Sequence, residues 1–403
     1  MKTLTLKLNL IIILLSVTWH LQAKTLYLNA PSYNSALQAL VNQCVAGDII
    51  ILRAGSHYVT TPIVFGIGRN GVTVRGENGA VVRKAQNSWN AAAFEISGNN
   101  NTIDNIDLDG GNLPEAGIII YGQRNTISNS KIHNCGNSSA VGAGILLHNS
   151  GNPVCALNTV IGCKVYYNYM VGISQNGHSD GRIQDNQIYE NGAEGLTVDI
   201  HSHNNYIFNN WIHRNNAANR GVGGVGIDFS NGNQLIGNTI DYTVFKSGIT
   251  FQNNIGGCDG TIVRDNRINF NEGYGILERF TQYQNTNSLF QNNELTGNRL
   301  GTHHVSYTVA RLGSDEQEKA GFSEELSMYP NPSQGHVTFD FGKYENENIS
   351  IVIKDLQGKV LHEKNLTGGR SYHLNNTDFL KKGAYIVKLT IGSSVKNRKL
   401  IVD

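Results

Sequence analysis

The chain has 403 residues, a formal net charge of +1 and an isoelectric point of about 7.7. That length leaves room for two or three domains with a large buried interior. The balanced charge argues against a nucleic-acid partner, and no acidic run forms a solvating tail. The 45 glycines against 6 prolines indicate tight, repeated turns rather than long helices.

Residues 1–23 have the composition of a secretory signal peptide. A charged start, MKTLTLK, is followed by the apolar run LNLIIILLSVTW and then by HLQA, which ends on a small residue. We therefore predict cleavage near Ala23. The apolar run is short for a membrane span, and no later stretch approaches the roughly 20 apolar residues that a span needs. We expect no transmembrane segment in the mature protein.

A repeat occupies most of the remaining chain. A glycine followed by an apolar residue recurs at Gly117, Gly144, Gly172, Gly195, Gly226, Gly248, Gly275 and, more weakly, Gly301. Subtracting successive positions gives intervals of 27, 28, 23, 31, 22, 27 and 26 residues. The repeating unit is therefore a coil of a little over twenty residues with insertions.

A second phrase, apolar-x-x-Asn-x-apolar, repeats in step with the first. Its asparagines are Asn186, Asn210, Asn238, Asn266 and Asn293, and earlier coils place Ser130 and Cys163 there. Short alternating strands bounded by Gly and Asn occur throughout, without helical periodicity. Two sequence phrases that repeat in step with each other predict a parallel β-solenoid.

From about residue 25 to 308 the chain resembles the right-handed parallel β-helix family in these GI-x-x and N-x-I phrases. The resemblance implies three short strands per coil, with the asparagines stacked at an inward turn where they satisfy buried backbone groups. The preceding stretch, ALQALVNQCVAGDIIILRAGSHY, resembles the start of many secreted β-helices. It implies one short amphipathic helix that caps the open end. We expect an all-β fold with a right-handed parallel β-helix over residues 24–310.

The tail divides into a linker and a small domain. Residues 311–325, RLGSDEQEKAGFSEE, are polar and predict a linker. Residues 326–403 resemble the C-terminal sorting domain of the type IX secretion system in PNP at 330–332, D-x-x-G at 355–358, KGAY at 382–385 and the basic stretch near the end. The resemblance implies a small β-sandwich, recognition by the type IX machinery, and a source among the Bacteroidota. We expect a Sec signal peptide followed by type IX export to the medium or the cell surface.

Five cysteines, Cys44, Cys135, Cys155, Cys163 and Cys258, form no C-x-x-C pair and show no zinc-like spacing. At most two disulfides could form, leaving one thiol over. We expect most of these residues to be small apolar side chains inside the repeat.

Aligning the coils on glycine turns the second and fourth residues after it toward solvent. The outward positions begin apolar or aromatic and become ionisable in the middle and late coils. The predicted catalytic residues are Asp199, His201, His203, Asp228 and Arg279. The predicted substrate-binding residues are Tyr121, His148, Asn176, His178 and Gln252.

Asp199 and Asp228 are expected to have Cα atoms about 8 Å apart, in the range where an acid and a base flank a glycosidic bond. The coil between them is the longest, and its excess, NNAANRGVGGVG, predicts a lip or lid over the site. Asp199, His201 and His203 are also candidate ligands of a divalent metal ion, so the presence of a cofactor stays open.

β-Helices of this kind most often act on extracellular polysaccharides as lyases, hydrolases or epimerases, as the resemblance implies. We expect β-elimination on a uronic-acid polymer, with His201 or His203 as base, Arg279 neutralising the carboxylate and Asp199 orienting a histidine. Two alternatives stay open. A glycoside hydrolase would use Asp199 and Asp228, and a non-catalytic glycan-binding or adhesin solenoid would use the apolar strip at Ile119, Tyr121 and Leu146. The polygalacturonase signatures Asp-Asp, Gly-His-Gly and Arg-Ile-Lys are missing, and we expect a monomer.

Overall fold

The computed structural model describes residues 23–85, 92–113, 115–138, 142–151, 154–254, 256–280 and 283–307 of the solenoid. In the tail it describes 327–329, 333, 337–341, 347–355, 357–367, 371–374, 379–391 and 394–402. Residues 1–22 of the predicted signal peptide and the predicted linker at 311–325 lie outside these ranges. No helix within the described ranges is long and apolar enough to cross a membrane.

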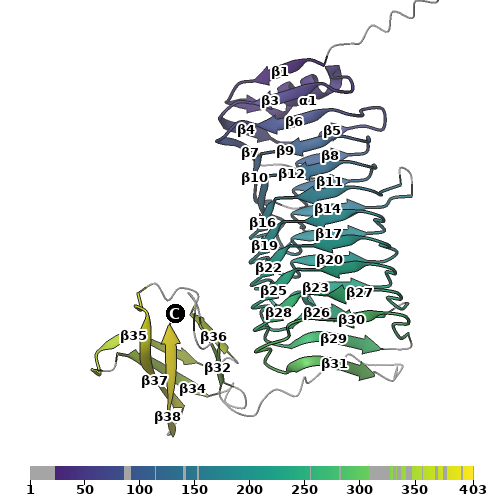
Figure 1. Cartoon of the computed structure of the whole chain (residues 1–403). Coiled ribbons are helices and arrows are strands. Elements are labelled where there is room, and N and C mark those ends of the chain that lie inside the picture. The colour runs from purple at the N-terminus through teal and green to yellow at the C-terminus, as the bar shows by residue number, and fades with distance from the viewer. Residues whose placement is uncertain are drawn as a thin grey trace, which may run out of the picture.

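The solenoid is built from three parallel sheets, each of which takes one strand from most coils (Figure 1). The first sheet consists of β1 (Thr25–Leu28), β3 (Ile49–Leu52), β6 (Thr73–Gly76), β9 (Thr102–Asp104), β12 (Thr126–Ser128), β15 (Thr159–Ile161), β18 (Arg182–Gln184), β21 (Tyr206–Phe208), β24 (Gln234–Ile236), β27 (Ile262–Arg264) and β30 (Leu289–Gln291). The second consists of β2 (Ser32–Tyr33), β4 (Gly55–Val59), β7 (Ala80–Lys84), β10 (Asp107–Leu113), β13 (Lys131–Cys135), β16 (Lys164–Tyr166), β19 (Gln187–Tyr189), β22 (Trp211–His213), β25 (Thr239–Asp241) and β28 (Arg267–Asn269). The third consists of β5 (Ile63–Phe65), β8 (Phe94–Ile96), β11 (Ile118–Ile120), β14 (Ile145–His148), β17 (Ile173–Asn176), β20 (Leu196–Asp199), β23 (Gly223–Asp228), β26 (Ser247–Phe251), β29 (Tyr274–Phe280) and β31 (Gly301–Tyr307). Three strands per coil were predicted and are confirmed.

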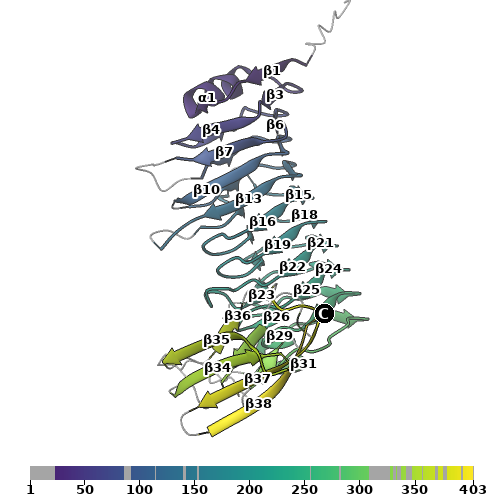
Figure 2. The same cartoon turned by 90° about the vertical axis from the view of Figure 1, so that its left-hand side faces the viewer.

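The helix α1 (Asn34–Gln43) lies at the N-terminal end of the solenoid, as predicted (Figures 1 and 2). Its buried residues Leu37 and Val41 belong to the same apolar core as the strands. The helix thereby covers core side chains that would otherwise face water at the first coil.

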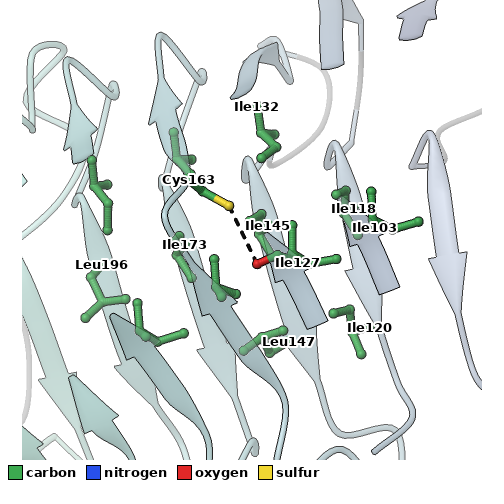
Figure 3. Close-up of a cluster of buried hydrophobic side chains, with 14 of the residues drawn as sticks. Ile103, Ile118, Ile120, Ile127, Ile132, Ile145, Leu147, Cys163, Ile173 and Leu196 are labelled. Carbon is green, nitrogen blue, oxygen red and sulfur yellow. Dashed lines mark hydrogen bonds between the residues drawn. The ribbon is translucent and has the colours of Figure 1, made fainter. Parts of the chain in front are cut away.

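The core is a column of aliphatic side chains that point inward from all three sheets (Figure 3). Alternate residues of each short strand, such as Leu196 and Val198 of β20, are fully buried and stack on their equivalents in the next coil. All five cysteines are buried free thiols. Burial raises the pKa of Cys135, Cys155, Cys163 and Cys258 to about 12, so these residues behave as small apolar side chains.

The glycine that aligns with Gly195 is Gly224, and the alignment on Gly226 was wrong. Gly195 N donates to Gly224 O at 2.9 Å, and Leu196 pairs with Val225. The two coils therefore have 29 and 24 residues (224 − 195 and 248 − 224) instead of 31 and 22. The GVGGVG segment permits several registers, and packing decides between them. Val225 and Ile227 are both buried in the core, whereas alignment on Gly226 would bring Phe229 inside.

The predicted asparagine ladder is confirmed. The Nδ2 atoms of Asn186, Asn210, Asn238 and Asn266 each donate to the Oδ1 atom of the next asparagine along the row, at 2.9–3.0 Å, ending on Asn293. Each Oδ1 also accepts the backbone N–H of the preceding asparagine. Further buried ladders, which the phrase did not reveal, join Asn168 to Asn191 and Asn215, and Asn205 to Asn233.

The tail forms a separate small domain of antiparallel strands. β32 (Ser327–Tyr329), β33 (Val337–Asp340) and β36 (Ser371–Leu374) form one sheet, and β34 (Asn348–Lys354), β35 (Val360–Thr367), β37 (Gly383–Ile391) and β38 (Ser394–Val402) form the other. Both sheets contribute to one buried core, which confirms the predicted sandwich. In the D-x-x-G motif, Asp355 Oδ1 accepts the backbone N–H groups of Gln357 and Lys359, and Gly358 takes a left-handed φ of 88°. That motif is therefore a turn between β34 and β35.

We expect Asn210→Ala to lower the free energy of unfolding by roughly 3 kcal/mol or more, because several buried backbone and amide groups would lose their partner. Chemical and thermal unfolding followed by far-ultraviolet circular dichroism measures the change. Asn42→Ala, on the exposed side of α1, is the matched control and should differ from wild type by less than about 0.5 kcal/mol. Equal stability of the Asn210 and Asn42 variants would contradict a supporting role for the ladder.

Candidate functional site

Most of the predicted site residues lie in one outward row on the third sheet. The strand register pairs His148 with Asn176, Asn176 with Asp199, and Asp199 with Asp228. Gln252 and Arg279 continue the row, because each follows an inward residue of the paired strands β26 and β29. At the early end, Tyr121 packs edge-on against His148, with ring centroids 5.9 Å apart. The row runs along the solenoid axis.

Asp199 and Asp228 are direct register partners, so the predicted Cα separation of 8 Å was wrong. Partners on neighbouring strands lie only about 4.8 Å apart. The error follows from the choice of Gly226, which displaced β23 by two residues and put Ser230 in the outward row. Ser230 is instead fully buried, and its hydroxyl donates to Asp228 O at 2.8 Å.

The Asp228 carboxylate is held from one side by Asn254. Its Oδ1 accepts the backbone N–H of Asn254 at 3.0 Å, and its Oδ2 accepts the Asn254 side-chain amide at 3.1 Å. The residue is only 9% exposed. A carboxyl group that accepts through both oxygens has the hydrogen-bond pattern of the ionised form.

The Asp199 carboxyl group has the opposite character. Burial is the largest effect and raises its pKa to about 7, with the negative charges of Glu194 and Asp228 adding to the rise. A hydrogen bond with Thr197 acts in the other direction. Near neutral pH, Asp199 is therefore a carboxyl group that can hold or release a proton, beside a carboxylate that accepts hydrogen bonds.

The chain turns immediately after Asp199, so His201 and His203 do not continue the row. Ile200 and His201 have left-handed φ angles of 37° and 61°. His201 is exposed, and its ring centroid lies 4.5 Å from that of Phe229. His203 Nδ1 accepts the backbone N–H of Asn231 at 2.9 Å, so the neutral ring carries its proton on Nε2. Burial lowers the pKa of His203, with the neighbouring His201 adding to the effect.

His178 lies inside the solenoid and not on the outward row. It is fully buried, and its Nε2 accepts the backbone N–H of Asn158 at 3.3 Å. Burial lowers its pKa to about 3, so the ring is neutral. Its other ring nitrogen lies 2.9 Å from the side-chain amide of Gln175, another inward residue. His178 therefore provides a hydrogen-bond partner for the Asn158 N–H and the Gln175 side chain inside the solenoid.

Sequence reasoning missed Glu194, a third carboxyl group beside the pair. Glu194 is buried, and its Oε1 accepts the backbone N–H of Val222 at 2.6 Å. Burial raises its pKa. The available signal was its position: the residue before the aligned glycine is Ala116, Ala143, Val171, Gly223, Ser247 or Tyr274 in the other coils, and only this coil has a charge there.

The glycine-rich insertion before β23 is fixed to the neighbouring coils. Arg220 places its guanidinium 3.8 Å from the centroid of the Tyr169 ring and donates from Nη1 to Tyr169 O at 2.9 Å. Val222 binds Glu194 through its N–H and accepts the Thr250 hydroxyl at 2.9 Å through its carbonyl. The insertion therefore borders the outward face of β20, β23 and β26 at Glu194, Gly226 and Thr250.

The predicted metal ligands Asp199, His201 and His203 do not have the arrangement that a metal site needs. Within the described ranges, no three His, Cys, Asp or Glu side chains are grouped so that they could hold an ion. The turn at Ile200 and His201 breaks the alternation on which convergence of Asp199, His201 and His203 depended.

We expect Asp199→Asn to stabilise the protein at pH 8 but not at pH 4. In the unfolded chain the carboxyl loses its proton near pH 3.9, whereas in the folded chain it keeps the proton up to about pH 7. The folded state binds more protons between these values, so wild-type stability falls as pH rises through that window. The asparagine of the Asp199→Asn variant has no proton to lose, so this decrease in stability does not occur. At pH 8 the free energy of unfolding of the variant should exceed that of wild type by roughly 1–3 kcal/mol.

Thermal unfolding at several pH values measures this difference. Asp185→Asn, at an exposed aspartate on a neighbouring coil, is the control and should show no such pH-dependent gain. A difference between the Asp199 variant and wild type that stays constant from pH 4 to pH 8 would contradict the raised pKa.

Comparisons with known proteins agree with this architecture. Residues 327–403 match the sequence profile described as a secretion system C-terminal sorting domain. This match indicates type IX secretion and a location outside the cell or on its surface. A search of curated proteins finds no match.

Three solved structures are similar to this chain at low sequence identity. The pectate lyase Pel9A is 17% identical, with a TM-score of 0.48, and the match covers 68% of this chain and 77% of that one. An alginate lyase from Paenibacillus is 12% identical with a TM-score of 0.45, covering 70% and 99%. A tailspike capsular polysaccharide depolymerase of an Acinetobacter baumannii bacteriophage is 12% identical with a TM-score of 0.46, covering 94% and 80%.

The solenoid itself matches the profile described as a right-handed β-helix region. Two overlapping matches, over residues 48–222 and 158–314, cover more than half of the chain. The strand order, the inward aliphatic column and the asparagine ladder agree with that assignment. The chain therefore belongs to the right-handed parallel β-helix family and has a C-terminal sorting domain of the secretion-system type.

Proposed function

We propose that the protein is a secreted carbohydrate-active enzyme, and that it hydrolyses glycosidic bonds with Asp199 and Asp228. The observation that carries this proposal is the pairing of two unlike carboxyl groups in direct register on β20 and β23. Asp199 retains a proton near neutral pH, whereas Asp228 accepts hydrogen bonds through both oxygens. Two carboxyl groups with different protonation states are the requirement for general acid catalysis beside a negative charge.

In this reaction Asp199 donates its proton to the glycosidic oxygen, and the bond from that oxygen to the anomeric carbon breaks. The Asp228 carboxylate faces the positive charge that develops at the anomeric carbon and attacks it. Water then releases the sugar from Asp228, and Asp199 takes back the proton. Carboxyl groups on adjacent strands are about 5 Å apart, which suits retention of the anomeric configuration better than inversion, where the gap exceeds about 6.5 Å.

The charges around the pair favour a neutral sugar at the point of cleavage. Three carboxyl groups lie close together here: Asp199 on β20, Asp228 on β23, and Glu194 just before β20. Glu194 and Asp228 both act on Asp199 electrostatically. A uronate bound among them would be repelled. The outward row of polar and aromatic side chains on either side, from Tyr121 to Arg279, offers contacts to further units of a polymer.

β-Elimination on a uronic-acid polymer is the second candidate, and the position of Arg279 favours it. Arg279 lies in the same outward row, two strands beyond Asp228, where its guanidinium suits a substrate carboxylate. The exposed His201 would then be the base. His203 suits that role poorly, because its Nδ1 already accepts a backbone N–H and its pKa is lowered.

We expect Asp199→Asn and Asp228→Asn each to lower the rate of hydrolysis by about 10²–10⁴, because each removes one partner of the acid–carboxylate pair. The measurement is the release of reducing ends from a panel of neutral and uronate-containing polysaccharides. Asp185→Asn is the control and should keep wild-type activity. Wild-type activity should also fall as pH rises through about 7, where Asp199 loses its proton.

The ultraviolet absorbance of unsaturated sugar ends separates the two candidates. Reducing ends without this absorbance support hydrolysis, and nuclear magnetic resonance of the first products then reports the anomeric configuration. Absorbance that disappears in His201→Ala but persists in Asp228→Asn would transfer the proposal to β-elimination. Neither product from any polymer, with glycan binding retained, would leave a non-catalytic solenoid.

A further inference from the structure

A second outward row, on a different sheet from Asp199 and Asp228, consists of stacked rings. In the second sheet, His133 pairs with Tyr166, Tyr166 with Tyr189, and Tyr189 with His213. Neighbouring ring centroids are 4.9, 4.9 and 5.0 Å apart, and the planes differ by 13°, 3° and 11°. We call these four residues the aromatic row. Its strands, β13 to β22, face the viewer in Figure 2. Each ring covers its neighbours' faces, so this stacking by itself stabilises the sheet.

Two further aromatic side chains beside the row leave much of their surface in water. Trp211 is 43% exposed although its indole stacks on His213, with centroids 4.1 Å apart. Tyr167 is 55% exposed and meets Tyr166 and Tyr189 edge-on, at 5.2 and 6.4 Å. Stacking within the row does not require either residue to be this exposed. A single exposed apolar residue is common on a protein surface, whereas aromatic rings exposed together on one face form the kind of patch that marks a binding site.

Polar groups beside both rings are fixed by hydrogen bonds. The Trp211 Nε1–H donates to Asp241 Oδ1 at 3.2 Å. Asp241 continues the register beyond His213, and burial raises its pKa to about 6. The Tyr167 hydroxyl is hydrogen-bonded to Glu190, and this bond, together with burial, raises its pKa to about 12. Each exposed ring thus lies beside oriented donors and acceptors.

The ionic groups of this face largely neutralise one another. Lys131 Nζ lies 3.2 Å from Asp107, Arg214 Nη1 lies 3.5 Å from Glu190, and Arg267 Nε lies 3.1 Å from Glu294. A surface with paired charges has little attraction for a polyanion. A neutral sugar ring complements it, because such a ring has an apolar face for an aromatic side chain and a rim of hydroxyl groups for fixed polar atoms.

We propose that this face of the second sheet binds a neutral polysaccharide, with Trp211 and Tyr167 as its two contact rings. The two residues belong to β22 and to the turn after β16, two strands apart and about 10 Å along the solenoid axis. A chain of several sugars reaches both, whereas a monosaccharide reaches one. The site lies on a different sheet from Asp199 and Asp228 and does not depend on their chemistry.

The test is affinity electrophoresis of the full chain in native gels that contain galactomannan, xyloglucan, mixed-linkage β-glucan or polygalacturonate. We expect at least one neutral polysaccharide to retard the wild type and polygalacturonate to have no comparable effect. Trp211→Ala and Tyr167→Ala should each weaken this binding by about fivefold or more. Tyr206→Ala is the matched control: Tyr206 is also 43% exposed, but lies on β21 of the first sheet, and its removal should leave retardation unchanged.

Two further variants keep the result interpretable. Trp211→Phe retains a ring against His213 and should fold even where Trp211→Ala does not, with binding between that of wild type and Tyr167→Ala. Asp199→Asn should lose hydrolysis but keep full retardation, which separates this site from the proposed catalytic pair. No retardation by any of the neutral polymers would overturn the proposal. Retardation by polygalacturonate alone, or retardation that Trp211→Phe and Tyr167→Ala leave unchanged, would overturn it as well.

Discussion

Parallel pairing between successive coils is the constraint on which the rest of this structure depends. Each strand hydrogen-bonds only to its equivalents one coil before and one coil after, so every coil must follow nearly the same path. The corners are where that path would drift, because the backbone there leaves the sheet ladder. Buried asparagine amides occupy those corners, donating to a carbonyl and to the next asparagine while accepting a backbone N–H. The amide stack therefore keeps the coils aligned where the sheets do not.

Outward side chains can then differ from coil to coil without disturbing the pairing of the strands. Outward residues of a short strand do not pack in the inward core, so a row passes from Tyr121 through Asn176 to Asp228 while the inward aliphatic column stays uniform. Within one row, side chains on neighbouring coils are held at a fixed spacing of about 4.8 Å. That spacing makes carboxyl groups on neighbouring coils influence each other, as at Asp199, and lets aromatic rings on neighbouring coils stack, as from His133 to His213.

The two candidate sites use this spacing in different ways. At Asp199, burial together with the nearby charges of Glu194 and Asp228 raises the pKa of the carboxyl group to about 7, whereas Asp228 accepts hydrogen bonds from Asn254. On the second sheet, rings on neighbouring coils stack and cover one another's faces, whereas Trp211 and Tyr167 beside the stack stay exposed. We therefore propose proton transfer on one sheet and contact with the apolar face of a sugar on the other. Both suit a protein that is sorted to the outside of the cell.

The repeat explains which features of the structure could be predicted from the sequence alone. The glycine and asparagine phrases determined the solenoid, the inward column and the ladder from Asn186 to Asn293, because each coil makes the same local contacts. The tail does not repeat, and its sorting domain was indicated instead by short motifs typical of that domain. The register of β23 did not follow from the sequence, since GVGGVG offers several equivalent glycines and only the burial of Val225 and Ile227 selects Gly224. The turn at Ile200 and His201, the inward position of His178 and the buried Glu194 were likewise decided by tertiary packing. A periodic pattern specifies what coils share, whereas the places where one coil departs from the others depend on which neighbours fill the space.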